Sequence, residues 1–196
     1  MGKSKTTDRS FKNNTGMRIY LIGFMGCGKT SIGRELAGVM KLRFIDLDEY
    51  IEKTEQRPVS DIFKLSGERY FRRREHIALK ELSGQDDFVL ATGGGTPCFH
   101  GNIYLLNRTG ISVWFRTGEE TLFSRLYASA IHRPLIKDLT PSELTEFIKT
   151  TLSAREPFYR KAGIIIDGID TENTKLSVTK ITEQISSYQV APGQTR

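Results

Sequence analysis

Nine residues restrict the possible folds of this chain more than any other segment: Gly-Phe-Met-Gly-Cys-Gly-Lys-Thr-Ser at positions 23–31. They fit G-x-x-x-x-G-K-[ST], the pattern of the phosphate-binding P-loop. The apolar run at residues 17–22 predicts a buried strand before the loop. Ile32, Leu36 and Met40 follow at the i, i+4, i+8 spacing of one helix face. The loop therefore lies between a strand and a helix, which is the context that the motif requires.

Each part of this loop has a chemical task. Gly23, Gly26 and Gly28 allow positive φ and bring backbone N–H groups close to phosphate oxygens. The N-terminus of the following helix adds a partial positive charge at the same place. In P-loops the lysine reaches the β- and γ-phosphates and the next hydroxyl is a Mg²⁺ ligand. We therefore predict a nucleotide site with Mg²⁺, formed by Gly26, Cys27, Gly28, Lys29, Thr30 and Ser31.

Length and composition indicate one domain with a substantial core. The chain has 196 residues, of which 38% are hydrophobic, and no apolar run is long enough to span a membrane. Residues 1–16 lack the apolar centre of a secretory signal. The only cysteines are Cys27, inside the P-loop, and Cys98. This usage favours reduced thiols in a cytoplasmic protein over a disulfide.

The net charge of +6 is concentrated near the N-terminus. Five basic residues and one acidic residue fall within residues 1–18, so about two net positive charges remain for the rest. Nucleic-acid binding requires a basic face with aromatic or groove-reading elements, and we find neither. We predict a monomer with no nucleic-acid or membrane partner. We also predict a disordered basic tail over 1–16, a single domain over 17–187 and a disordered tail over 188–196.

Apolar strands alternate with helices along the domain. This order is typical of an α/β fold in which helices cover both faces of a parallel sheet. Thr140 followed by Pro141 marks the start of one helix. After the P-loop helix, we predict strands at 43–46, 88–91, 111–115 and 164–166, and helices at about 47–53, 59–65, 68–82, 101–107, 119–127, 141–154 and 177–187.

Two carboxylates stand where the second predicted strand ends. In an extended segment Asp46 and Asp48 point to the same side. The carboxyl edge of a parallel sheet faces the crevice where ligands bind. Asp46 is a candidate Mg²⁺ ligand, directly or through water, and Asp48 is a candidate acceptor for a substrate hydroxyl. The alternative is two solvated carboxylates.

Glycines and isolated arginines supply the other candidates. Gly93–Gly95 follow a core strand and predict a tight turn or a close approach to the backbone, rather than a flexible linker. Arg72 can pair with Glu75 at i+3, and its guanidinium fork fits a carboxylate, although an arginine run is usually a solvated face. Arg133, beside a proline, suits a lid over a reacting phosphate or an ordinary surface loop. Arg155 has no assigned role by itself.

As an ordered set, these motifs resemble the shikimate kinase family. The resemblance covers about residues 17–187, and only the P-loop is shared widely among other NTPases. The further matching motifs are Gly33-Arg34 and Leu36-Ala37, D-x-D at 46–48, G-E-x-x-F-R-x-x-E at 67–75, G-G-G at 93–95, R-P-L at 133–135 and R-x-x-[LF]-Y at 155–159.

The resemblance implies a three-layer αβα P-loop kinase fold. Its five-stranded parallel sheet has helices on both faces, a mobile lid at about 127–137 and a small substrate-binding helical subdomain at about 47–75. It also implies transfer of the ATP γ-phosphoryl group to the 3-hydroxyl of shikimate, a step in aromatic amino acid biosynthesis.

The same resemblance implies roles for single residues at the nucleotide. Lys29 and the loop backbone hold ATP, and Arg133 closes from the lid onto the phosphates. Thr30 and Asp46 organise Mg²⁺. An arginine that stacks on adenine is often present in the family, and here that role is open between Arg125 and no residue.

At the shikimate site, the resemblance implies that Asp48 holds the ring hydroxyls and helps to activate the attacking one. Arg72 and Arg155 clamp the carboxylate, and Gly93, Gly94 and Gly95 contribute backbone N–H groups. The implied catalytic residues are Lys29, Asp48 and Arg133. The alternatives are another small-molecule P-loop kinase, such as a gluconate or nucleoside monophosphate kinase, or a non-catalytic nucleotide-binding module.

Overall fold

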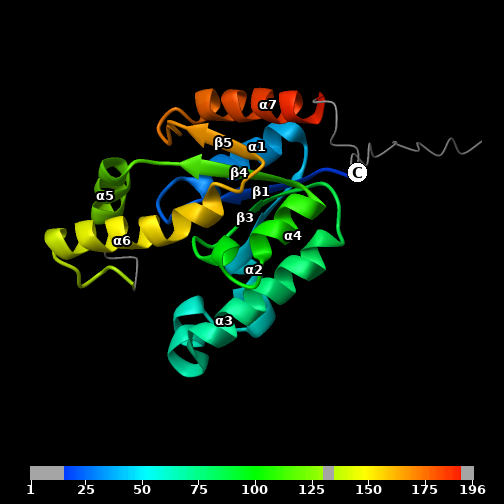
Figure 1. Ribbon diagram of the computed structural model, residues 1–196. Helices are drawn as coiled ribbons and strands as arrows, with labels where there is room; N and C mark the ends of the chain where they lie inside the picture. Colours follow the sequence, from blue (N-terminus) through cyan, green and yellow to red (C-terminus); the bar gives the residue numbers. More distant parts are fainter. Residues whose placement is uncertain (1–15, 130–134, 191–196) are drawn as a thin grey trace, which may run out of the picture.

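Five parallel strands form one sheet in the computed structural model, which describes residues 16–129 and 135–190 (Figure 1). The order β2-β3-β1-β4-β5 places β1 at the centre. The chain crosses from β3 to β4 over β1, so the strand order reverses at the carboxyl end of β1, where α/β folds bind ligands. The strands are β1 (Arg18–Ile22), β2 (Arg43–Asp46), β3 (Phe88–Ala91), β4 (Ile111–Arg116) and β5 (Ile164–Asp167).

Helices cover both faces of the sheet because alternate side chains of β1 are buried in opposite directions (Figure 1). Ile19 and Leu21 pack against α1 (Lys29–Met40) and α7 (Thr174–Val190). Tyr20 and Ile22 pack on the other side, where α2 (Leu47–Glu55), α3 (Val59–Ser83) and α4 (Asn102–Thr109) lie. The helices α5 (Glu119–Ala128) and α6 (Pro141–Tyr159) extend the first face, and η1 (Thr96–Cys98) is a short 3₁₀ turn. The predicted three-layer α/β fold is confirmed.

Three helices differ most clearly from the prediction. The two helices predicted at 59–65 and 68–82 are joined in α3 across a kink at Gly67, where φ is 79° and ψ is 167°. α6 continues to Tyr159 although it contains Pro157, because a proline in the last turn removes only one intrahelical hydrogen bond. α7 ends at Val190, so residues 188–190 are helical and do not belong to the tail predicted from 188.

The start of α6 follows the prediction. The Thr140 hydroxyl accepts a hydrogen bond from the Glu143 backbone N–H at 3.3 Å, and the Glu143 carboxylate accepts from the Thr140 backbone N–H at 2.8 Å. This reciprocal capping box satisfies donors that the first helical turn leaves free.

Among residues 16–129 and 135–190, none of the helices combines the length and the hydropathy of a membrane span.

The close packing of α1 on the sheet predicts a stability effect at Gly33. A Cβ atom there would lie 2.7 Å from Phe44 Cε2 and 2.8 Å from Leu21 Cδ1. We expect Gly33→Ala to lower the free energy of unfolding in urea by about 1–3 kcal/mol through overpacking. Gly38→Ala in the same helix is the control. A Cβ at Gly38 would have no atom within 4 Å of it, apart from its chain neighbours and the nearby backbone of α1. Alanine is the better helix former, so Gly38→Ala should leave stability unchanged or raise it by up to about 1 kcal/mol. Equal effects of the two substitutions would contradict the packing argument.

Candidate active site

The loop after β1 has the backbone geometry that its glycines predict. The φ angles of Gly23, Gly26 and Gly28 are 142°, 79° and 96°. Gly28 is the left-handed N-cap residue of α1, and a Cβ there would lie 2.6 Å from Thr171 Cγ2. The loop can therefore turn its N–H groups and the positive end of α1 toward a bound anion.

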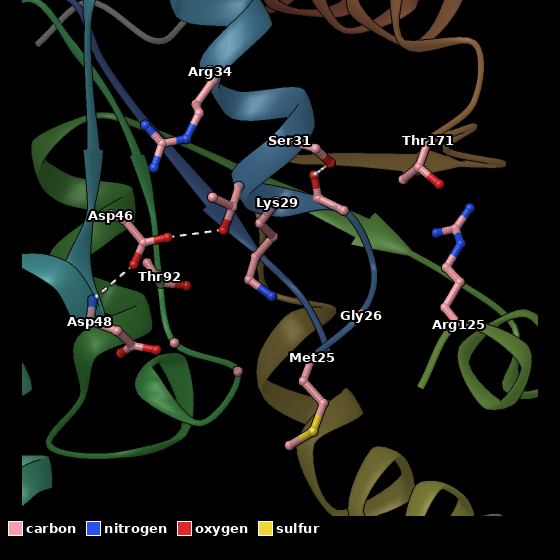
Figure 2. Close-up of a pocket in the computed structure, with 14 residues that line it drawn as sticks. Met25, Gly26, Lys29, Ser31, Arg34, Asp46, Asp48, Thr92, Arg125 and Thr171 are labelled. Atoms are coloured by element: carbon pink, nitrogen blue, oxygen red, sulfur yellow. Dashed lines mark hydrogen bonds between the residues drawn. The ribbon is translucent and has the colours of Figure 1, made fainter. Parts of the chain in front are cut away.

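A cavity of about 620 Å³ lies beside this loop (Figure 2). Cys27 does not line it, although the sequence placed Cys27 in the nucleotide site. Its side chain is buried in the hydrophobic core, and its N–H donates to the Phe24 carbonyl at 3.3 Å, so neither group faces the cavity. The other predicted nucleotide-binding residues of the loop line the cavity: Gly26, Gly28, Lys29, Thr30 and Ser31.

The Lys29 side chain folds back onto the loop that precedes it. Its ammonium donates to the carbonyl oxygens of Gly23 at 2.9 Å and Phe24 at 2.8 Å, and lies 3.6 Å from the Cys27 sulfur. Only 8% of the residue is exposed. A positive charge is thus held at the cavity wall, where anionic oxygens of a ligand would be additional acceptors.

Asp46 joins the ends of β2 and α1. Its Oδ2 accepts a hydrogen bond from the Thr30 hydroxyl at 2.9 Å, and its Oδ1 caps α2 by accepting from the Asp48 N–H at 3.0 Å (Figure 2). The argument that an extended segment points both side chains to the same side does not apply, because the helix predicted at 47–53 begins at Leu47 and Asp48 lies in its first turn. Both carboxylates nevertheless line the cavity, since the cap turns Asp48 back toward the carboxyl edge of the sheet.

The buried Asp48 carboxylate has few interactions that offset the cost of its burial. Its Oδ1 is buried and has no hydrogen-bond partner among the described residues. Burial raises its pKa to about 7, the negative charges of Glu75 and Asp46 add to this shift, and Lys29 opposes it. The carboxyl group therefore changes protonation state near neutral pH, which suits a group that accepts a proton from a substrate.

A second cavity of about 290 Å³ adjoins the first. Met25, Asp48, Gly93 and Gly94 line both cavities. The remaining wall of the second cavity is partly apolar and partly charged. It consists of Val59, Phe63, Phe71, Leu135, Arg72, Glu75, Gly95 and Arg155.

Arg72 is held rigidly at the wall of the second cavity. Its guanidinium donates to Glu75 Oε2 at 2.9 Å and to Glu68 Oε1 at 2.9 and 3.1 Å, and it lies 4.5 Å from the centre of the Phe99 ring. The predicted pairing with Glu75 is confirmed. The alternative of a solvated face is wrong for Arg72, because only 8% of the residue is exposed.

Gly93–Gly95 form a turn against which charged groups pack closely. A Cβ at Gly93 would lie 2.8 Å from Glu75 Oε1, one at Gly94 3.1 Å from Arg155 Nη1, and one at Gly95 2.6 Å from Arg72 Nη2. Close approach therefore explains the three glycines, and the flexible-linker interpretation is wrong.

Arg155 lies on α6 with its guanidinium 5.6 Å from the centre of the Phe24 ring. Its Nη1 is buried and makes no hydrogen bond to the described residues. A buried donor without a partner costs free energy unless a ligand or water satisfies it. This atom is consequently a strong candidate for contact with an anionic group in the second cavity.

Glu75, Arg125 and Thr171 are among the residues at the two cavities that the sequence did not assign to the site. Glu75 is fully buried, and the Thr96 hydroxyl donates to it. Arg125, which was left open, lines the first cavity and donates to the Ile169 carbonyl at 3.0 Å. Thr171 lies on the same side of this cavity, opposite Asp46 (Figure 2).

A local signal for Thr171 was present in the sequence. Gly168 and Asp170 follow β5 at the carboxyl edge of the sheet, where ligands bind. Asp170 Oδ1 accepts from the N–H groups of Glu172 at 2.8 Å and Asn173 at 3.0 Å, which is the turn that an aspartate after a strand favours.

Arg133, the predicted lid arginine, lies in residues 130–134, outside the described residues.

The parallel sheet, the phosphate loop after its central strand and the adjoining small-molecule cavity define a P-loop kinase. The family model described as "Shikimate kinase" matches residues 25–186. This chain belongs to the shikimate kinase family, and it is an enzyme that uses ATP. The family resemblance in the sequence is thereby confirmed.

Individual relatives agree with this assignment. The chain is 43% identical over 150 residues to a shikimate kinase of Parabacteroides distasonis. The aligned region covers 76% of this chain and 87% of that protein. The crystal structure of shikimate kinase from Bacteroides thetaiotaomicron has a TM-score of 0.83 and 36% identity, and covers 87% of this chain and 98% of that chain. Shikimate kinase from Acinetobacter baumannii, solved in complex with shikimate, has a TM-score of 0.81 and 35% identity, over 91% and 97% of the two chains.

Proposed function

We propose that this protein transfers the γ-phosphoryl group of ATP to the 3-hydroxyl of shikimate, giving shikimate 3-phosphate and ADP. The observation that carries the proposal is the shared wall of the two cavities. Asp48, Gly93, Gly94 and Met25 line both, so a phosphoryl group in the first cavity can meet a hydroxyl in the second without crossing solvent. In-line placement of this kind is the main requirement of phosphoryl transfer.

ATP occupies the larger cavity in this proposal. Its phosphates lie on the loop N–H groups, the N-terminus of α1 and the Lys29 ammonium, all of which are positive. The adenine ring of ATP lies toward Arg125 and Thr171, at the end of the cavity opposite Asp46. The hydrogen bond from Arg125 to the Ile169 carbonyl supports this assignment, because it holds Arg125 against the loop that carries Thr171.

The residues present fit a Mg²⁺ ion. The Thr30 hydroxyl and the Asp46 carboxylate are oxygen donors 2.9 Å apart beside the phosphate loop. The described residues contain no group of three or more His, Cys, Asp or Glu side chains that could hold a metal. One hydroxyl and one carboxylate match Mg²⁺, because this ion usually keeps several waters and binds through one or two carboxylates and the substrate phosphates. When bound, the ion would neutralise phosphate charge.

Shikimate occupies the smaller cavity. Arg155 and Arg72 bind its carboxylate, because a guanidinium fork matches a carboxylate in two-point fashion. Apolar side chains, such as those of Phe63 and Val59, cover the ring. Asp48 accepts the hydrogen bond of the attacking hydroxyl and takes its proton as the bond to phosphorus forms. Its raised pKa supports this role, since a base of pKa near 7 is matched to neutral pH.

An ADP-release assay tests the proposed function. We expect ADP formation from ATP and Mg²⁺ to depend on shikimate, with no comparable rate for gluconate or nucleoside monophosphates. Turnover with gluconate alone would favour the sugar-acid kinase alternative. Tight ADP binding without turnover of any of these acceptors would favour a non-catalytic nucleotide-binding module.

Removal of the two arginines should separate their roles. We expect Arg155→Ala and Arg72→Ala each to weaken shikimate binding by about 2–5 kcal/mol in titration calorimetry, as a lost buried charge pair. Only Arg72→Ala should also lower thermal stability strongly, because it leaves buried Glu75 without its partner at 2.9 Å. Exposed Arg69→Ala is the control on the same helix. Unchanged shikimate affinity in both variants would exclude the clamp.

We further infer a monomer in the cytoplasm. Cys27 and Cys98 are both free thiols, which supports a reducing compartment. Sedimentation of the purified chain measures the first property, and the location of a tagged chain in its own cell measures the second.

A further inference from the structure

Tyr159, the last residue of α6, contacts the glycine turn that the two cavities share without lining either cavity. It is 0% exposed, and its ring packs on Trp114 with the centroids 5.7 Å apart. Its hydroxyl donates a hydrogen bond to the Gly94 carbonyl, in the glycine turn that both cavities share. A buried tyrosine hydroxyl needs a hydrogen-bond partner, whereas phenylalanine would fill the same space without one.

Gly94 lies between the nucleotide loop and the proposed carboxylate clamp. A Cβ at this residue would be 3.1 Å from Arg155 Nη1, 3.3 Å from the Met25 backbone nitrogen and 3.6 Å from the Gly23 carbonyl oxygen. The place of Gly94 therefore limits how close the nucleotide loop and Arg155 can come. The group that holds the Gly94 carbonyl is the Tyr159 hydroxyl.

Arg155 and Tyr159 are one turn apart on α6, so their side chains lie on the same face of the helix. Burial raises the pKa of the Tyr159 hydroxyl above its usual range, and the neighbouring Arg155 guanidinium opposes this shift without cancelling it. The hydroxyl consequently keeps its proton at neutral pH and remains a donor to Gly94.

We propose that Tyr159 is a positioning residue that fixes Gly94 and thereby sets the distance between the nucleotide loop and the Arg155 guanidinium. This inference rests on the proposed function for the role of Arg155. Without the hydroxyl, the turn moves more freely, and Arg155 no longer meets the shikimate carboxylate at a fixed distance from the phosphates.

Tyr159→Phe tests the proposal because it removes one oxygen and keeps the ring on Trp114. Tyr20→Phe is the matched control: Tyr20 is also 0% exposed, and its hydroxyl shares a hydrogen bond with Thr109 Oγ1 at 2.9 Å, outside both cavities. We expect similar small losses of melting temperature in both variants. We expect Tyr159→Phe alone to raise the shikimate dissociation constant about tenfold, the equivalent of one hydrogen bond.

Two further measurements distinguish positioning from a structural role. In Tyr159→Phe, the ADP dissociation constant should stay within about twofold of the original, and the ratio of the shikimate dissociation constants measured without and with saturating ADP should move closer to one than in the original chain. Equal shikimate affinity in Tyr159→Phe and the original chain, or the same weakening in Tyr20→Phe, would overturn the proposal.

A double-mutant cycle tests the route through Arg155. If Tyr159 acts through Arg155, adding Tyr159→Phe to Arg155→Ala should weaken shikimate binding little further. A full additional tenfold loss would overturn that route. A failure of the original chain to bind or phosphorylate shikimate would instead remove the proposed function, and this inference with it.

Discussion

Replacing Asp48 with asparagine should lower kcat with shikimate by about 10²–10⁴, the usual contribution of a general base. The amide keeps the shape of the side chain but cannot take the proton of the attacking hydroxyl. The charge of Asp48 also interacts with Lys29 and Asp46, so the substitution changes the electrostatics of the site. Asparagine has nearly the same volume and therefore opens no cavity. ADP affinity, measured by calorimetry, should change by less than about tenfold, because the proposed nucleotide site holds the phosphates on the loop and Lys29.

The same variant has a stability effect whose sign follows from the raised pKa. The unfolded chain releases the Asp48 proton near the usual value of 3.8, whereas the folded chain keeps it up to about 7. Between these values the folded state binds more protons, so this group makes stability fall as pH rises. The asparagine side chain of the variant does not ionise and carries no such penalty. We therefore expect Asp48→Asn to melt above the original chain, by a larger margin at pH 8 than at pH 5.

The control is Asp61→Asn, at an exposed carboxylate in the first turn of α3 outside both cavities. It should leave kcat unchanged and show no pH-dependent gain in melting temperature. If Asp48→Asn retains more than about a tenth of kcat, Asp48 is not the base, because removal of a base costs at least about 10². A margin that shrinks between pH 5 and pH 8 would contradict the raised pKa.

Replacing Arg133 with alanine should lower kcat by about 10³–10⁵, the range for an arginine that stabilises the transferring phosphoryl group. This prediction rests on the sequence, since Arg133 lies outside the described residues. If Arg133 acts only on charge that develops during transfer, ground-state ADP binding should remain nearly intact. The measurement is steady-state kinetics with ATP and shikimate varied separately.

Exposed Arg73→Ala on α3 is the control for loss of one surface cation. It should leave both kcat and KM near their original values. An effect of Arg133→Ala confined to the KM for ATP would mean that Arg133 only holds the nucleotide, and its catalytic role would be excluded.

The sequence predicted the elements of the fold well because their signals are local. The strand Arg43–Asp46 and the strand Phe88–Ala91 have the predicted bounds, since short apolar runs between turn residues leave little choice. The bounds of α7 failed at both ends, because no strong stop signal marks its last turn. The helix predicted at 141–154 runs on to Tyr159, and Pro157 in its last turn does not end it.

The candidate site was predicted less completely. Asp46 and Asp48 line the nucleotide cavity as expected, but through a helix cap and not through an extended segment. Cys27 has the right place in the motif, yet its side chain belongs to the core. The importance of Glu75 could not be predicted, because its full burial depends on the glycine turn 18 or more residues further along the chain.

The sequence by itself determined the phosphate loop, the alternation of strands and helices and the family, because each of these depends on residues close together in the chain. Only the tertiary structure decided which side chains from separate elements meet at the carboxyl edge of the sheet. It placed Arg125 against the loop after β5 and the Tyr159 hydroxyl on Gly94. It also set the pKa of Asp48, because burial and the charge of Glu75 act through space and not along the chain.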